Sequence, residues 1–596
     1  MKKIFKSPIL WGVLAALLVI VPQINIYQFD GTDCIHIGLL EGLWDYPGMG
    51  PFNLYRFADG NPERMSEIIS KAYYPWFTSP DWKVSFCRHL PSALIALNHK
   101  ICGLKPLGYT IHSLLWYMAL ISILGLLVRR IVLGWHGKLS HPVTYLTLII
   151  FAFSTSHMLI LFYGAARWLL IATTLALSGL LAHLKWREQG WKPGRYLSLI
   201  AFFLALLSGE AALAVLAYLA AYELFGSQEP FKKRIKALLP TAVLVFVYLI
   251  FYRIMDYGTG GQDLYINPLT DPIAFITALP TRILSMLGEM FLRIISVFGI
   301  DPIVPSMGWV IILAGAAALV ICGLLFYPVW SKASVDQHRK FRWLIIGTIA
   351  AMFPLASGYP CARVAMIPFI GGSVLLAFIL YHWWHKLSQK RNIRQNLKSP
   401  TAWIGGLTII VLFFLHLVLS PYCWFAAPRE FKKYLDNREE FNRNNPVLNK
   451  IRPHQEAIFL NSSVNIDLTY DVYYYRKINR LPLPGAWWQL SFYNQKHRYL
   501  RTAEDKLELG LIGGSMFDHF PFLSMMRSSK TPLKKGEVIK LSGLEITILQ
   551  VNENGPTRME FTFGRSLDDE RYLFFKFQDG VLHTIPPPSV GQSITL

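Results

Sequence analysis

The stretch "FDGTDCIHIGLLEG" (Phe29–Gly42) follows directly on the first long apolar run of this 596-residue chain. Two aspartates and a histidine stand where the chain has just left a segment that is apolar enough to lie in lipid. Because charged side chains are costly inside a bilayer, this position is typical of the membrane surface. Asp33 and His36 are three residues apart, so a helix that begins here would carry both on one face.

Apolar runs recur along most of the chain, in which 53% of the residues are hydrophobic. Runs of roughly 17–25 apolar residues are typical of membrane-spanning helices. The sequence therefore predicts a polytopic α-helical membrane protein with about eleven transmembrane helices. The runs occupy approximately 8–26, 108–128, 143–162, 168–184, 196–208, 211–225, 237–254, 307–328, 343–357, 364–383 and 402–421.

The net charge of +21 comes from 58 basic and 37 acidic residues. Much of the basic excess lies in short loops between apolar runs, such as Lys232/Lys233/Arg234/Lys236. The positive-inside rule explains this pattern and predicts a cytoplasmic N-terminus and an outer C-terminus. The basic segments lack interleaved aromatic residues, so the pattern argues against a nucleic-acid partner.

Whether segment 271–299 crosses the membrane determines on which side of it the later loops lie. It is apolar enough to cross the membrane, but it contains Pro280 and the charged residues Arg282, Glu289 and Arg293. A crossing here would reverse the side of every later basic cluster. We therefore interpret it as an amphipathic helix that lies in the membrane interface.

Two large regions fall on the outer side. The first is the loop 27–107, which has helix-like stretches and two tryptophans, Trp76 and Trp82, suited to the membrane interface. The second is the tail, whose end alternates like strands around the turn signal "NENGP". The predicted domains are a transmembrane domain, 1–423, and an extracytoplasmic soluble domain with a β-rich end, 424–596.

A carboxylate at the membrane surface can act as a general base toward a hydroxyl that arrives from outside. Asp33 could instead cap a helix, as aspartates often do. The length of the loop favours the first interpretation, because a simple channel or transporter rarely needs some eighty ordered residues after its first helix.

One helix followed by a long outer loop that opens with an acidic residue resembles the GT-C glycosyltransferases. "DCIH" (33–36) resembles the Asp-Glu-x-His start of the first loop in protein O-mannosyltransferases, with Cys34 in place of the Glu. The stretch 85–117 is similar to one in bacterial GT-C proteins, although His89 replaces the usual Pro. Stretches 165–188 and 195–225 also resemble that group, with Gly209-Glu210 in place of its Lys-Glu.

This resemblance implies a transmembrane GT-C fold over about residues 8–420 and an inverting sugar transfer from a polyprenyl-phosphate donor. The acceptor hydroxyl attacks the anomeric carbon and polyprenyl phosphate leaves as a stable anion, so one base is enough. Asp33 is the candidate catalytic base. The candidate substrate-binding residues are His36, Asp81, Arg88 and Arg363, the two arginines as partners of the phosphate.

The sequence shows no metal-ligand spacing, so we expect no metal and no cofactor other than the lipid-linked sugar. We expect the acceptor to be a protein, a lipid or a glycan. We expect the chain itself to lie in a bacterial inner membrane, with its tail in the periplasm. A polysaccharide polymerase or ligase remains an alternative, although its large outer loop usually comes later in the chain. A transporter of lipid-linked glycans is the other, although such proteins often contain repeats and charged residues in mid-membrane.

Overall fold

The computed structural model describes residues 8–20, 29, 31–44, 46, 48–71, 73–133, 142–388, 400–461, 468–493, 496–518, 525–578 and 580–596. Its contacts divide the chain into two compact units. The helical unit comprises Met1–Tyr27, Phe86–Met255 and Ile266–Lys432. The second, β-containing unit comprises Gln28–Ser85, Asp256–Tyr265 and Lys433–Leu596. The tail therefore shares its unit with most of the first outer loop, and the predicted boundary near 424 falls within one continuous helix, α18 (Ser420–Asn444).

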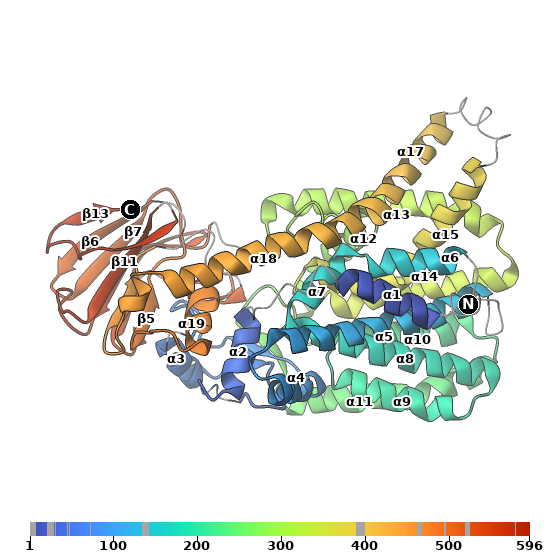
Figure 1. Cartoon of the computed structure of the whole chain (residues 1–596), viewed down its shortest axis with the longest axis horizontal. Coiled ribbons are helices and arrows are strands. Elements are labelled where there is room, and N and C mark those ends of the chain that lie inside the picture. The colour runs from blue at the N-terminus through green and yellow to red at the C-terminus, as the bar shows by residue number, and fades with distance from the viewer. Residues whose placement is uncertain are drawn as a thin grey trace. The chain divides into compact units, whose positions relative to one another are not determined.

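The helical unit consists of long apolar helices joined mostly by short connections (Figure 1). Gly190, in the left-handed conformation, ends α8 and allows α9 to turn back against it. The main helices are α1 (Pro8–Ile20), α4 (His89–Cys102), α5 (Pro106–Leu133), α6 (Pro142–Ala152), α7 (Met158–Phe162), α8 (Arg167–Gln189), α9 (Pro193–Leu206), α10 (Ala212–Ala221), α11 (Phe231–Ile254), α12 (Pro272–Leu292), α13 (Gly308–Ser331), α14 (Val335–Leu355), α15 (Pro368–Ser388) and α17 (Pro400–Phe414).

The chain is a multi-pass helical membrane protein. Six helices of the described residues are long and apolar enough to cross a membrane, or seven if the bent pair α6–α7 counts as one span. Three apolar helices are shorter, at Leu10–Val19, Pro193–Leu206 and Ala212–Gly226. The predicted number of about eleven spans is thus not confirmed, because several apolar runs fold into short or broken helices. The two helices of the bent pair meet at 46°.

Helix α12 covers the segment that we interpreted as interfacial. Its length and composition would allow it to cross a membrane. However, Arg282, midway along α12, donates to the backbone oxygens of Ala356 and Gly358, at 2.6 and 2.9 Å. These oxygens lie just beyond the C-terminal end of α14, whose first turns carry the basic residues of the predicted inner side. The middle of α12 therefore contacts the segment that follows α14, and the interfacial interpretation stays a prediction.

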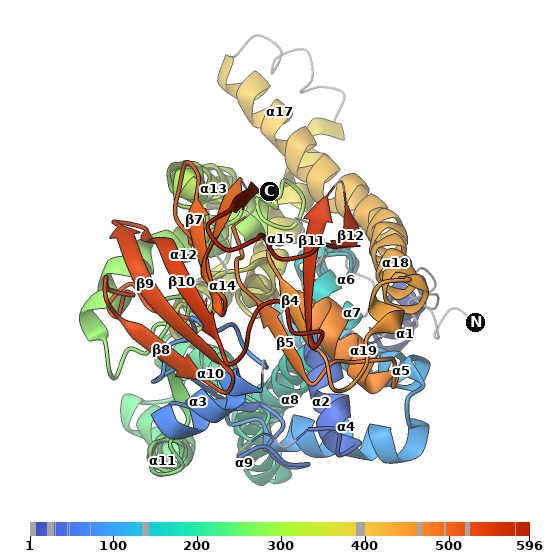
Figure 2. The same ribbon diagram turned by 90° about the vertical axis from the view of Figure 1, so that its left-hand side faces the viewer.

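The second unit contains three sheets. Figure 2 shows strands of the two larger ones, such as β9 and β10 of one and β4 and β5 of the other. The six-stranded sheet has the order β13-β6-β7-β10-β9-β8, and its alternating apolar residues face inward, as in β9, where Leu544, Ile546 and Ile548 are buried. The other two sheets have the orders β1-β2-β3 and β12-β11-β4-β5. The strands are β1 (Arg56–Asp59), β2 (Lys83–Ser85), β3 (Gly258–Gly260), β4 (Glu456–Phe459), β5 (Ala486–Gln489), β6 (His497–Ala503), β7 (Lys506–Leu511), β8 (Val538–Leu541), β9 (Leu544–Asn552), β10 (Gly555–Phe563), β11 (Tyr572–Gln578), β12 (Val581–Thr584) and β13 (Ser593–Thr595).

The helices of this unit are α2 (Gly31–Leu40), α3 (Pro62–Ser70) and α19 (Tyr474–Ile478), together with the C-terminal part of α18. The β-rich end of the tail is confirmed, including the turn at "NENGP" between β9 and β10. The interfacial interpretation of Trp76 and Trp82 is wrong. Both side chains are buried, and their indole N–H groups donate to the backbone oxygens of Leu490 and Met525 in the tail.

Candidate functional site

Asp33 lies in the first turn of α2, immediately after the first apolar helix and a short connection. Its side chain is only 8% exposed. An ionised carboxylate at such a position is costly unless nearby dipoles stabilise it. The N–H groups at the start of α2 supply a positive end of the helix dipole there. The sequence thus places a buried carboxylate at the N-terminal end of α2, where the helix dipole stabilises a negative charge.

Cys34 stands where the resembled motif has an acidic residue. Its side chain points into the protein. It is 1% exposed, and its thiol donates to the backbone oxygen of Phe29, with 3.7 Å between the sulfur and the oxygen. The start of α2 is also anchored by Arg438 of α18, which donates to the same oxygen at 2.7 Å. These contacts hold the start of α2 in place. Asp33 is the acidic residue of its first turn.

His36 shares the helix face of Asp33, as the spacing predicts, and it is 1% exposed. Its ring meets Tyr55 edge-on, with 4.7 Å between centroids, and stacks on Phe57 of β1 at 5.7 Å. The imidazole is therefore held by aromatic rings in one orientation. This arrangement suits a residue that positions a neighbour better than one that moves freely to meet a substrate.

The C-terminal half of α2 packs on Trp44, whose indole N–H donates to the backbone oxygen of Ile35 at 3.0 Å. Gly38 faces this ring so closely that a Cβ atom would lie 2.1 Å from it. Only glycine fits here without moving the ring or the helix.

We expect Gly38→Ala to lower the stability of the second unit by about 1–3 kcal/mol, because the added methyl group overpacks the contact with Trp44. Thermal unfolding of the purified chain, monitored by tryptophan fluorescence, measures the change. Gly50→Ala is the matched control, since nothing lies within 4 Å of the new Cβ at that position. Equal unfolding temperatures for the two variants would contradict the tight contact at Gly38.

A cluster of aromatic side chains joins the first loop to the tail within the second unit. The ammonium group of Lys477 lies 5.5 Å from the ring centroid of Trp44, 5.1 Å from that of Tyr73 and 5.6 Å from that of Tyr473. Burial lowers the pKa of Lys477, and the charge of Lys71 lowers it further. The sequence analysis missed this cluster, although the tyrosine-rich stretches "KAYYPW" (71–76) and "YDVYYYRK" (470–477) were a signal for it.

Asp81 lies in an exposed turn before β2, within the same compact unit as Asp33. Its carboxylate accepts a hydrogen bond from the hydroxyl of Ser79 at 2.5 Å. This local contact agrees with the capping or turn role that aspartate often has. The predicted substrate-binding role of Asp81 stays a prediction.

Arg88 belongs to the helical unit and immediately precedes α4. Its guanidinium lies 4.1 Å from the ring centroid of Phe86 and 3.6 Å from that of Trp168. Glu210 opposes its charge at 3.7 Å and also accepts from the backbone N–H of Cys87 at 3.0 Å. Glu210 therefore makes a contact between helices, and Arg88 is a stacked, partly neutralised cation rather than a mobile one.

Gly209 explains a departure from the resembled group, which usually has lysine there. Its φ is +151°, and a Cβ atom would lie 2.5 Å from the ring of Trp168. A side chain at 209 would therefore displace the ring that stacks on Arg88. The glycine and the stacked arginine are parts of one local arrangement.

Arg363 is half-buried in a short helix, Ala362–Met366, between α14 and α15. Two further cations of the chain have structural roles. Lys83 pairs with Asp256, and Arg167 is fully buried with hydrogen bonds to Ser113 and to the backbone of Tyr109. The phosphate-binding roles of Arg88 and Arg363 stay predictions, and both residues lie in the other unit from Asp33, His36 and Asp81.

The sequence analysis also missed a buried polar network in the helical unit. Glu289 and Arg293 of the segment around α12 are both 0% exposed, and their charged groups are 3.9 Å apart. Ser156 donates to Glu289 at 2.6 Å, and Arg293 donates to Ser156 at 3.1 Å. Arg293 also lies 3.2 Å from a ring nitrogen of His416. The expectation that these charges face the membrane surface, as on an amphipathic helix, is wrong for Glu289 and Arg293.

Within the described ranges, no group of three or more histidine, cysteine or carboxylate side chains could hold a metal ion. Within the second unit, the candidate site is the sheltered carboxylate and the histidine on α2. Such a carboxylate can accept a proton.

No known family profile and no curated protein match the sequence. Among the solved structures that match the chain are the following two. ArnT from Cupriavidus metallidurans, bound to undecaprenyl phosphate, matches over 80% of this chain and 89% of its own, with 9% identity and a TM-score of 0.39. The Archaeoglobus fulgidus oligosaccharyltransferase, tethered with an acceptor peptide containing the NVT sequon, matches over 80% of this chain and 64% of its own, with 12% identity and a TM-score of 0.35. At these TM-scores, neither structure assigns a residue or a substrate to this chain.

Proposed function

We propose that the protein is a membrane glycosyltransferase that moves a sugar from a polyprenyl-phosphate donor to an acceptor hydroxyl on the outer face of the membrane. One observation carries the proposal: Asp33 is a sheltered carboxylate in the first turn of the helix that follows the first apolar helix. This is the place that the resembled loop motif gives to its catalytic aspartate. The stated side of the membrane follows from the distribution of basic residues.

In the proposed reaction, Asp33 accepts the proton of the acceptor hydroxyl as its oxygen bonds to the anomeric carbon. The bond between that carbon and the phosphate oxygen breaks, and polyprenyl phosphate leaves with the electron pair. The leaving group is already a stable anion, so no general acid is required. His36, which contacts the rings of Tyr55 and Phe57 on the same helix face, is the proposed substrate contact beside this base.

A single displacement inverts the configuration at the anomeric carbon. We therefore expect a donor with one anomeric configuration to give a product with the opposite one. The test incubates the purified chain with a synthetic polyprenyl-phosphate hexose and cell-envelope acceptor extract, and NMR assigns the anomeric proton of the product. A product with retained configuration would contradict the single-base mechanism.

The buried pair Glu289–Arg293 does not favour the transporter alternative. A transporter needs ionisable groups that line a substrate or ion path. Both side chains of this pair are fully buried, and Ser156 forms a hydrogen bond with each of them. They therefore form a structural contact between helices.

A further inference from the structure

A groove lies between α5 and α8 in the helical unit, near the C-terminal ends of the two helices, where both carry basic residues. Its volume is about 440 Å³. It is lined by Ile123, Leu126, Arg129, Arg130, Ser178, Leu181, Ala182, Lys185, Gln189 and Trp191. The proposed transfer reaction uses none of these residues.

The groove is divided into an apolar and a basic half along the helix axes. Ile123 and Leu126 of α5 lie one to two turns deeper than Arg129, and Leu181 of α8 lies one turn deeper than Lys185. At 1.5 Å per residue, the step from Ile123 to Arg129 spans about 9 Å. A ligand of this groove must therefore be apolar at one end and polar at the other.

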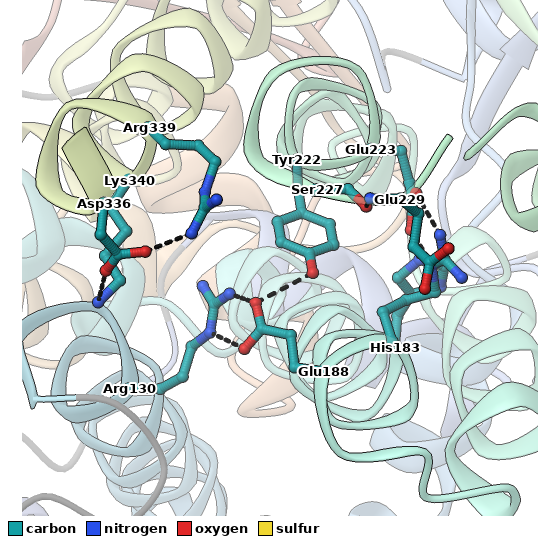
Figure 3. Close-up of polar contacts among 11 residues, drawn as sticks. Arg130, His183, Glu188, Tyr222, Glu223, Ser227, Glu229, Asp336, Arg339 and Lys340 are labelled. Atoms are coloured by element: carbon teal, nitrogen blue, oxygen red, sulfur yellow. Dashed lines mark hydrogen bonds and ion pairs between the residues drawn. The ribbon is translucent and has the colours of Figure 1, made fainter. Parts of the chain in front are cut away.

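The basic half favours an anion. The described residues that line the groove include three cations and no carboxylate. One cation is already neutralised, because Arg130 donates to Glu188 at 2.8 Å and the hydroxyl of Tyr222 donates to the same carboxylate at 3.0 Å (Figure 3). The other two cations of the groove, Arg129 and Lys185, are half-buried at its wall.

Trp191 closes the polar end. The ammonium group of Lys185 lies 4.5 Å from its ring centroid, which holds the lysine beside the groove. Tryptophan at the end of a span is typical of the lipid headgroup level. An apolar wall, two cations and an interfacial tryptophan match the acyl chain, the phosphate and the headgroup level of a phospholipid.

We propose that this groove binds one anionic glycerophospholipid, with its phosphodiester at Arg129 and Lys185 and an acyl chain along Ile123, Leu126 and Leu181. The site is separate from the proposed transfer reaction and stands without it. The lipids that surround a membrane protein exchange freely and are removed by delipidation. A specific lipid site differs from them because it retains one particular lipid after delipidation.

The test titrates the delipidated full chain in nonionic detergent with dioleoylphosphatidylglycerol and counts bound lipid by native mass spectrometry. We expect one retained phosphatidylglycerol and about tenfold weaker binding of dioleoylphosphatidylcholine. The double variant Arg129→Gln/Lys185→Gln should lose this preference. The matched control Lys232→Gln/Lys236→Gln removes the same charge from exposed positions at the start of α11 and should keep it.

A second variant, Leu181→Trp, fills the apolar half and leaves both cations in place. It should weaken phosphatidylglycerol binding about as much as the charge variant does, while far-UV circular dichroism and unfolding temperature report that each variant is folded. Equal binding of both lipids, or loss of preference in the control variant as well, would overturn the proposal. So would full competition by inorganic phosphate, which would indicate a site for a free anion instead of a lipid.

Discussion

Asp33→Asn should lower the rate of sugar transfer by about 10²–10⁴-fold, the contribution typical of a general base. The amide keeps the size and most of the shape of the carboxylate, but it cannot accept the proton of the acceptor hydroxyl. Because Asp33 is buried in the first turn of α2, the variant changes one functional group without changing exposed surface. The measurement is turnover under saturating donor, together with the donor affinity of each protein.

The matched control is Asp505→Asn, which makes the same change in the turn between β6 and β7 of the same unit. It should retain turnover within about twofold, because surface substitutions of this kind leave stability nearly unchanged. Asp33→Glu should keep measurable activity, since it retains a carboxylate at a displaced position. Undiminished turnover in folded Asp33→Asn would exclude this residue as the base.

Arg293→Met should be among the most destabilising single substitutions in the helical unit, at about 3–5 kcal/mol. The change leaves the carboxylate of Glu289 fully buried without the cation 3.9 Å away. It also removes the hydrogen bonds of Arg293 to Ser156 and His416. Thermal unfolding in detergent should show a large fall in the midpoint, which the double variant Glu289→Gln/Arg293→Met should partly restore.

An exposed ion pair provides the comparison for this prediction. Lys233 and Glu229 are 3.1 Å apart, and their side chains are 66% and 38% exposed. Lys233→Met should change stability by no more than about 1 kcal/mol, because water screens such pairs. If Arg293→Met and Lys233→Met unfold at the same temperature, the buried network contributes far less to stability than its burial implies.

The sequence predicts a multi-pass helical protein with a β-rich tail because both features depend on local periodicity. Long apolar runs and alternating strands can be recognised from residues that are neighbours in sequence. The number of spans depends on more than this. A bend between α6 and α7 and the short helices α9 and α10 are set by packing against other helices, which composition alone does not record.

The candidate site was predictable in part for the same reason. Asp33 and His36 share a helix face because they are three residues apart, and the structure confirms this placement. The burial of Trp76 and Trp82 was not predictable, because their partners Leu490 and Met525 lie more than 400 residues away. The same holds for Arg293, whose neighbours Ser156 and His416 come from distant parts of the chain.

The release of polyprenyl phosphate by the purified chain tests the central proposal most directly. The protein is incubated with a panel of synthetic polyprenyl-phosphate sugars and envelope acceptor extract, and the freed lipid phosphate is quantified by mass spectrometry. We expect release from at least one of these donors, dependent on acceptor, and no sugar transfer to the acceptor from the corresponding nucleotide sugars. Binding of the donors without any release, in folded protein with acceptor supplied, would contradict the assignment as a transferase.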